Sequence, residues 1–80
     1  MDKIRTVLEI FGKLKMPAAS LSGDADLYNA GLTSFASVQL MLGLEEAFDV
    51  EFPEHMLNRK TFSSITAIEQ AITEITRAAA

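Results

Sequence analysis

The sequence predicts an all-α fold, a small bundle of four helices with a long loop between the first two and a short third helix. Apolar residues recur at helical spacing in three segments, and a proline-led stretch can form one more short helix. The chain has 80 residues, of which 49% are hydrophobic and 22% charged, as in a packed globule. Residues 1–80 are therefore expected to form one domain.

The first helix is expected to begin near Ile4. Its apolar positions follow the helical repeat: Ile4, Val7, Leu8, Phe11 and Leu14. Asp2 can cap the helix or interact with its positive end, and the pair Met16-Pro17 should terminate it.

The stretch "AASLSGDADLYNAGLT" mixes Ser, Gly, Asp and Asn without a repeat, as connecting segments do. At about twenty residues this connector is longer than a compact bundle needs, so it either has a function or packs as a structured segment. Four of its residues could attach it to the core: Leu21, Leu27, Tyr28 and Leu32.

The second helix is expected from Phe35 to Phe48, with one apolar face interrupted only by Glu45. That face consists of Phe35, Val38, Met41, Leu42 and Phe48. After Pro53, a short helix can form around Glu54 to Leu57.

The last helix can be capped by Ser63-Ser64 and should end in a frayed segment, residues 77–80. Its apolar positions are Ile65, Ile68, Ile72 and Ile75. The expected core of the bundle is formed by Phe11, Val38, Leu42, Phe48, Ile65, Ile68 and Ile72.

Charge and cysteine content exclude several functions. Seven basic and eleven acidic residues give a formal charge of −4, which argues against a nucleic-acid binder and favours protein partners. The chain has no cysteine, hence no disulfide framework and no thiolate zinc site. The N-terminal stretch mixes charged and apolar residues, unlike a secretory signal, and no stretch is long enough to span a bilayer. We expect a cytoplasmic monomer.

Ser34 lies directly before the long amphipathic run, where a hydroxyl often caps a helix, and Thr33 could serve equally well. A catalytic serine would need an adjacent base, and the only histidine, His55, lies in a polar turn. The nearby carboxylates have no clustered histidines, so we expect no metal site: Glu45, Glu46, Asp49 and Glu51. These observations predict a protein that is not an enzyme.

A phosphate esterified to Ser34 would lie at the positive end of the second helix, where unpaired backbone N–H groups favour an anion. Gly31, three residues earlier, would allow a tight approach of the chain and leave space for a modifying enzyme. The position is therefore suited both to a cap and to an attached phosphate group.

The stretch "AGLTSFASVQLMLGLEEAFDVEFP" resembles the attachment motif and second helix of acyl carrier proteins. In that family the serine of Gly-x-x-Ser bears 4′-phosphopantetheine, a role that the resemblance assigns to Ser34. It implies an acyl-carrier-protein-like four-helix bundle, modification by a phosphopantetheinyl transferase (holo-synthase), and transport of an acyl group as a thioester. An unmodified helical adaptor, in which Ser34 only caps, is the alternative from another class.

Carrier proteins of fatty acid synthesis typically have Asp before the serine and further acids along the second helix, whereas this chain has Thr33, Ala36 and Gln39 there. Since complementary charge sets partner choice, these differences point away from generic fatty-acid partners. With "DADLYNAGLTSF" and "LNRK", the chain is similar to aminoacyl carrier proteins, which are loaded by ligases related to class II aminoacyl-tRNA synthetases. A fatty-acyl or polyketide carrier is the alternative within the family.

A loading ligase is therefore the expected partner, together with a downstream acceptor that the sequence does not identify. The candidate docking residues are Thr33, Phe35, Leu40, Leu44, Arg59 and Lys60. Leu40 and Leu44 lie off the main apolar face of the second helix and could equally be extra core. Phe35 could likewise face the core or a partner.

Overall fold

The computed structural model describes residues 2–12 and 14–79, and within these ranges every regular element is helical. The elements are α1 (Asp2–Phe11), the 3-10 helix η1 (Ala18–Ser20), α2 (Ser34–Phe48), the 3-10 helix η2 (Glu54–Met56) and α3 (Ile65–Ala79). The all-α prediction is confirmed. The described residues form three α-helices rather than four, because the short third helix of the prediction is a single 3-10 turn.

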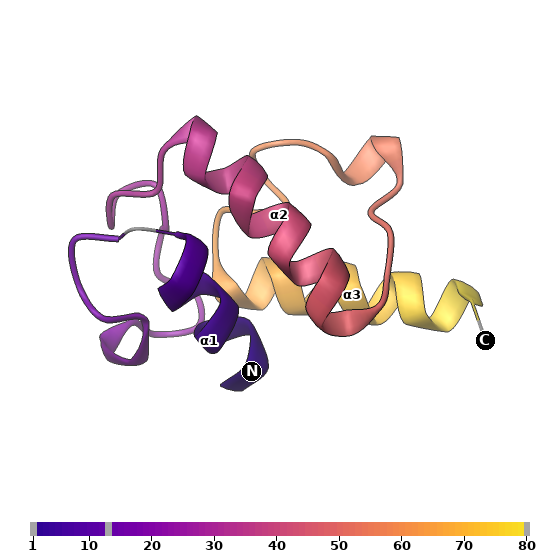
Figure 1. The fold of residues 1–80 in the computed structure, drawn as a ribbon, viewed down its shortest axis with the longest axis horizontal. Coiled ribbons are helices and arrows are strands. Elements are labelled where there is room, and N and C mark those ends of the chain that lie inside the picture. Colours follow the sequence, from indigo (N-terminus) through magenta and orange to yellow (C-terminus); the bar gives the residue numbers. More distant parts are fainter. Residues whose placement is uncertain (1, 13, 80) are drawn as a thin grey trace.

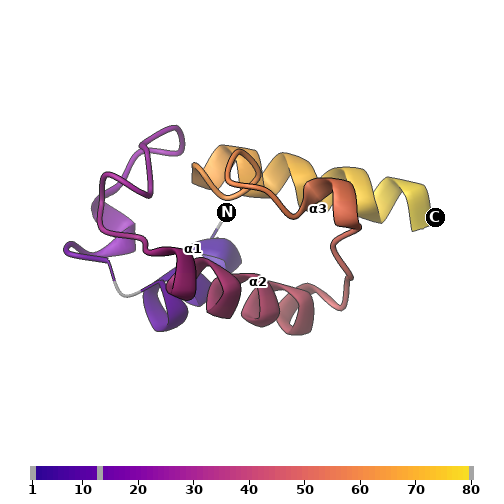
Figure 2. The same ribbon diagram turned by 90° about the horizontal axis from the view of Figure 1, so that it is seen from above.

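The three α-helices form two layers. In Figure 2, α3 lies on one side of the molecule and α1 and α2 lie on the other, and Figure 1 shows α2 crossing in front of α3. α1 packs against both α2 and α3. Six side chains with almost no exposed surface lie at the centre: Leu8, Leu27, Leu40, Leu44, Ile65 and Ile68.

α1 ends earlier than predicted, at Phe11 and not at the pair Met16-Pro17. Gly12 follows directly, and its N–H donates to the Leu8 carbonyl at 2.7 Å. A Cβ on Gly12 would lie 2.6 Å from that same oxygen, so the turn that ends the helix needs a glycine. The helix therefore stops at Gly12, well before Pro17. The predicted cap at Asp2 lies outside the described side chains.

The segment between α1 and α2 is hydrogen-bonded to α1 and to the residues that precede α3. Arg5 Nη1 donates to the Ala18 carbonyl at 2.6 Å and to the Leu21 carbonyl at 2.7 Å. At the other end, Leu27 N–H donates to the Ser63 carbonyl at 2.8 Å. The leucines predicted to attach this segment are buried: Leu21, Leu27 and Leu32.

The predicted inward face of α2 is wrong. Val38 and Leu42 are 52% and 51% exposed, whereas Leu40 and Leu44 are completely buried. α2 is apolar around much of its circumference, so the spacing of its apolar residues does not select one face. The choice follows from packing, because Gly43 lets the Phe11 ring of α1 approach closely: a Cβ there would lie 2.6 Å from two ring carbons.

The predictions for the C-terminal helix agree with the structure more closely. Ser64 Oγ accepts a hydrogen bond from Ala67 N at 3.0 Å, which makes Ser64 the cap. Ile65, Ile68 and Ile72 are buried as predicted, while Phe11 and Phe48 are only partly buried. α3 includes residues 77–79, and Ala80 lies outside the described residues. None of the described helices combines the length and apolar character of a membrane span.

Candidate functional site

Ser34 is the first residue of α2, and its side chain is exposed. The cap is Thr33, whose Oγ1 accepts a hydrogen bond from Ala36 N at 3.0 Å. Ser37 Oγ donates to the backbone carbonyl of Ser34 at 2.7 Å, and among the described residues no group hydrogen-bonds the Ser34 hydroxyl. The two adjacent hydroxyls therefore differ: Thr33 caps the helix, whereas the Ser34 hydroxyl has no hydrogen-bond partner among the described residues.

A turn with a glycine at positive φ leads into this position. Gly31 has a φ of +113°, a backbone conformation that residues with a Cβ rarely adopt. A Cβ there would also lie 3.0 Å from Lys15 Cγ and 3.2 Å from Lys15 N. The next residue, Leu32, is buried, and its N–H donates to the Leu27 carbonyl at 3.0 Å. The chain therefore enters α2 in a fixed direction, which fixes the place of Ser34.

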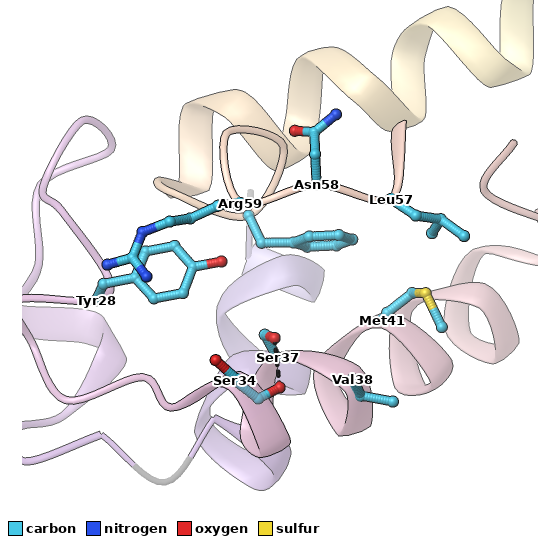
Figure 3. Close-up of a pocket in the computed structure, with 9 residues that line it drawn as sticks. Tyr28, Ser34, Ser37, Val38, Met41, Leu57, Asn58 and Arg59 are labelled. Carbon is cyan, nitrogen blue, oxygen red and sulfur yellow. Dashed lines mark hydrogen bonds between the residues drawn. The ribbon is translucent and has the colours of Figure 1, made fainter. Parts of the chain in front are cut away.

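Ser34 lines a cavity of about 540 Å³ between α2 and the segment that follows η2. Its walls are Tyr28, Ser34, Ser37, Val38, Met41, Leu57, Asn58, Arg59 and Phe62. Figure 3 shows Tyr28, Arg59 and Ser34 toward one end and Met41 and Leu57 toward the other. The cavity therefore has a polar end beside the free hydroxyl and an apolar end farther along α2.

The polar end contains a stacked pair. Arg59 Cζ lies over the Tyr28 ring, 3.9 Å from its centroid. Burial raises the pKa of the Tyr28 hydroxyl above its ordinary value of 10.0; Arg59 opposes this rise, Asp26 adds to it, and a hydrogen bond with the Ser37 side chain opposes it. Tyr28 is therefore neutral at physiological pH, and the positive charge at this end of the cavity belongs to Arg59.

The predicted docking residues do not lie together. Leu40 and Leu44 are completely buried, so they cannot contact a partner and that prediction was wrong. Both lie on the buried face of α2, whereas Val38 and Leu42 lie on its exposed face. Thr33, Arg59 and Lys60 are exposed, and only Arg59 of these three lines the cavity with Ser34.

Phe35 is 70% exposed and lines a separate hollow with α1. The other residues of that hollow are Ile10, Phe11 and Gln39. Phe35 is therefore not part of the core, and its contact with a partner stays a prediction.

Sequence reasoning did not assign several cavity residues to the site. Val38 was assigned to the core, Tyr28 to attachment of the loop, and Met41 to the inward face of α2, but all three line the cavity. Pattern alone gives no signal for Val38 and Met41, since an apolar residue on α2 suits the core and the surface groove equally. His55 is exposed in η2, and among the described residues no three His, Asp or Glu side chains form a metal-binding group.

The chain matches one protein family and is similar to individual proteins of known type. The family model described as "Phosphopantetheine attachment site" matches residues 5–72. An aminoacyl carrier protein of Agrobacterium fabrum is 61% identical over 69 residues, covering 86% of this chain and 83% of that protein. A D-alanyl carrier protein of Streptococcus pyogenes is 35% identical over 74 residues, covering 91% of this chain and 94% of that protein.

A solved structure is also similar. It is the carrier protein from Agrobacterium tumefaciens in complex with an engineered Bradyrhizobium japonicum glycine:[carrier protein] ligase and AMP. The match has a TM-score of 0.88 and 58% sequence identity, and it covers 90% of this chain and 96% of the other. The fold and the sequence are therefore both similar to those of carrier proteins.

Proposed function

The chain belongs to the family defined by the phosphopantetheine attachment site, and on that premise we propose that Ser34 is the attachment residue and that the cargo is a small amino acid. The protein is a carrier that holds its load through 4′-phosphopantetheine. The observation that supports Ser34 most directly is its exposed hydroxyl, which no described residue engages and which opens into the cavity.

The residues around Ser34 fit a phosphate ester. The first turn of α2 contains no acidic side chain, so no carboxylate there repels an anion. Thr33 already caps the helix, so modification of Ser34 breaks no hydrogen bond of the fold. Arg59 provides a cation at the polar end of the same cavity. The hydroxyl that forms the ester, a cation and the space for the phosphopantetheine are therefore all present.

The bound group supplies a terminal thiol on which a load is held as a thioester. The chain has no cysteine and so no thiol of its own. Its residues position the arm: the turn at Gly31 and the Thr33 cap fix the start of α2, and Ser34 provides the ester oxygen. We propose that the protein catalyses no step itself and that its enzymes perform the chemistry.

The amino acid cargo is supported by the relatives and by charge. Both named relatives are carriers of amino acids, and the structural neighbour was solved with a glycine:[carrier protein] ligase. α2 has no acidic residue before Glu45, so an enzyme docking near Ser34 meets no acidic stripe. We propose a holo-synthase, an amino acid:carrier protein ligase and a downstream acceptor as partners of a cytoplasmic monomer. A fatty-acyl carrier role fits this neutral surface poorly.

Intact mass tests the attachment. Incubation with coenzyme A and a holo-synthase should add one phosphopantetheine to the wild type and none to Ser34→Ala. Ser37→Ala is the matched control, because it removes a neighbouring hydroxyl and should still be modified. Labelling that persists in Ser34→Ala would refute the assignment, and labelling of no variant would favour the unmodified adaptor.

A comparison of loading enzymes tests the cargo. The holo protein should accept small amino acids from an amino acid:carrier protein ligase and should be a poor substrate for a malonyl-transferring enzyme of fatty acid synthesis. Phe35→Ala, which removes exposed apolar surface, should slow aminoacylation more than Glu46→Gln does. Efficient malonyl loading without aminoacylation would establish an ordinary acyl carrier.

A further inference from the structure

We infer that Arg59, stacked on Tyr28, binds the phosphodiester of the group on Ser34 and holds the first part of the arm along the cavity. This inference rests on the proposed attachment at Ser34. It gives Arg59 a role inside the carrier itself, in contrast to the role in partner docking expected from the sequence.

The geometry of the pair leaves the guanidinium free to bind an anion. A guanidinium 3.9 Å from a ring centroid contacts the ring with its face. Its N–H donors lie in the plane of the group and point outward, so stacking does not consume them. Two parallel N–H groups match two phosphate oxygens, the arrangement that makes arginine a frequent phosphate ligand. Tyr28 thus orients Arg59 without neutralising it.

No described carboxylate competes for Arg59. Within residues 2–12 and 14–79, Arg59 has no salt bridge, and its only described ring contact is Tyr28. Asp26 is the acid whose charge acts on the pKa of Tyr28. Its Oδ1 already accepts hydrogen bonds from Tyr28 N at 3.0 Å and Asn29 N at 3.5 Å. The cation is therefore available to the phosphate that attachment would introduce.

The cavity also matches the order of groups along the arm. The arm begins with a phosphate at the serine oxygen and continues with a carbon bearing two methyl groups. The cavity begins with Ser34 and Arg59 and continues with Val38, Met41 and Leu57. Its volume of about 540 Å³ is in the range of small-molecule sites. Exposed apolar side chains on this wall would lose contact with water when the arm covers them.

The test compares apo and holo forms of each variant in the absence of any partner. Wild type, Arg59→Gln, Arg59→Lys and Lys60→Gln are prepared in both forms, with attachment verified by intact mass. Lys60→Gln is the matched control, because it removes the same charge from the adjacent exposed residue, which does not line the cavity. The readouts are the melting temperature and the NMR signals of the Arg59 side-chain N–H and the Tyr28 ring.

Conversion to the holo form should raise the melting temperature by roughly 4 °C in the wild type and in Lys60→Gln. The rise should disappear in Arg59→Gln, be partial in Arg59→Lys, and shrink at high salt. The Arg59 and Tyr28 signals should shift on conversion of the wild type. Because each variant is compared with its own apo form, a loss of stability from the substitution itself does not affect the result.

Two outcomes would overturn the inference, and they are distinguishable. Equal rises in wild type and Arg59→Gln, with complete attachment and unchanged Arg59 signals, would show that the arm does not use Arg59 while leaving the proposed function intact. A wild type that gains no mass would remove the attachment at Ser34 and the inference with it.

Discussion

Truncation of Leu40 tests the orientation of α2, on which the location of the cavity depends. Leu40 is completely buried, so Leu40→Ala removes its contacts and leaves a void in the core. Such substitutions cost about 2–5 kcal/mol. A domain of 80 residues has a total stability of about 4–12 kcal/mol, so the loss is a large part of the whole.

Leu42→Ala is the matched comparison, two residues away on the same helix with the same change in side chain. Leu42 is 51% exposed, so it buries about half of its surface. Full burial of a leucine side chain contributes about 1.5–3 kcal/mol, which leaves a cost of about 1 kcal/mol for this variant. Leu40→Ala should therefore cost at least twice as much as Leu42→Ala.

Urea unfolding followed by circular dichroism measures the difference, provided that both variants keep the wild-type slope. Thermal unfolding should show the same order, with losses of about 8 °C or more for Leu40→Ala and about 4–8 °C for Leu42→Ala. If Leu42→Ala is destabilised as much as Leu40→Ala, the exposed face of α2 is assigned incorrectly, and the cavity beside Ser34 would not exist as described.

Three further predictions address the helix start, the α1–α2 contact and Tyr28. Thr33→Ala should cost about 1 kcal/mol of unfolding free energy, because it removes the cap, whereas Ser34→Ala should change it by less than about 0.5 kcal/mol; equal losses in chemical denaturation would contradict the division of roles. Gly43→Ala should cost about 1–3 kcal/mol by overpacking against the Phe11 ring, and an unchanged denaturation midpoint would mean that α1 is farther from α2. The single tyrosine, Tyr28, should titrate above pH 10.0 in an ultraviolet titration, and further above it in Arg59→Gln, since Arg59 lowers its pKa; a fall would show that the pair is not formed. Because folding raises this pKa, the associated stability is fully present below pH 10.0 and lost as pH rises through the pKa of the folded state.

The sequence was sufficient to predict elements whose signals are local. Ser64 precedes a regular isoleucine repeat, and both the cap and the buried face of α3 are as predicted. Pro53 likewise marked the start of η2. Such features depend on residues a few positions apart, which a single sequence displays directly.

The orientation of α2 depends on partners far away in the sequence. Its apolar residues offered two possible faces, and the predicted one, with Val38 and Leu42, carried the larger side chains. The structure buries the face with Ala36, Leu40 and Leu44, and Gly43 lets the Phe11 ring of α1 approach closely. The face that the spacing favoured is therefore exposed, and the close contact with α1 depends on a glycine that carries no apolar signal.

The same orientation explains why the site contains residues that the sequence analysis had assigned to the core. With Leu40 and Leu44 in the core, the exposed Val38 and the partly buried Met41 line the cavity that contains Ser34. The segment after η2 then brings Arg59 to Tyr28 across this wall, although the two are far apart in the chain.

The adjacent hydroxyls at the start of α2 separate stability from modification. If Ser34 were the cap, esterification would convert its hydroxyl into a bulky ester, and the hydrogen bond that starts the helix would be weakened. Because Thr33 Oγ1 accepts the hydrogen bond from Ala36 N, the helix start is complete before Ser34 is modified. Ser34, at the first helical position, still lies next to the backbone N–H groups that favour a phosphate. The fold can therefore accept the charged group at the N-terminal end of α2 without losing an interaction that stabilises the helix.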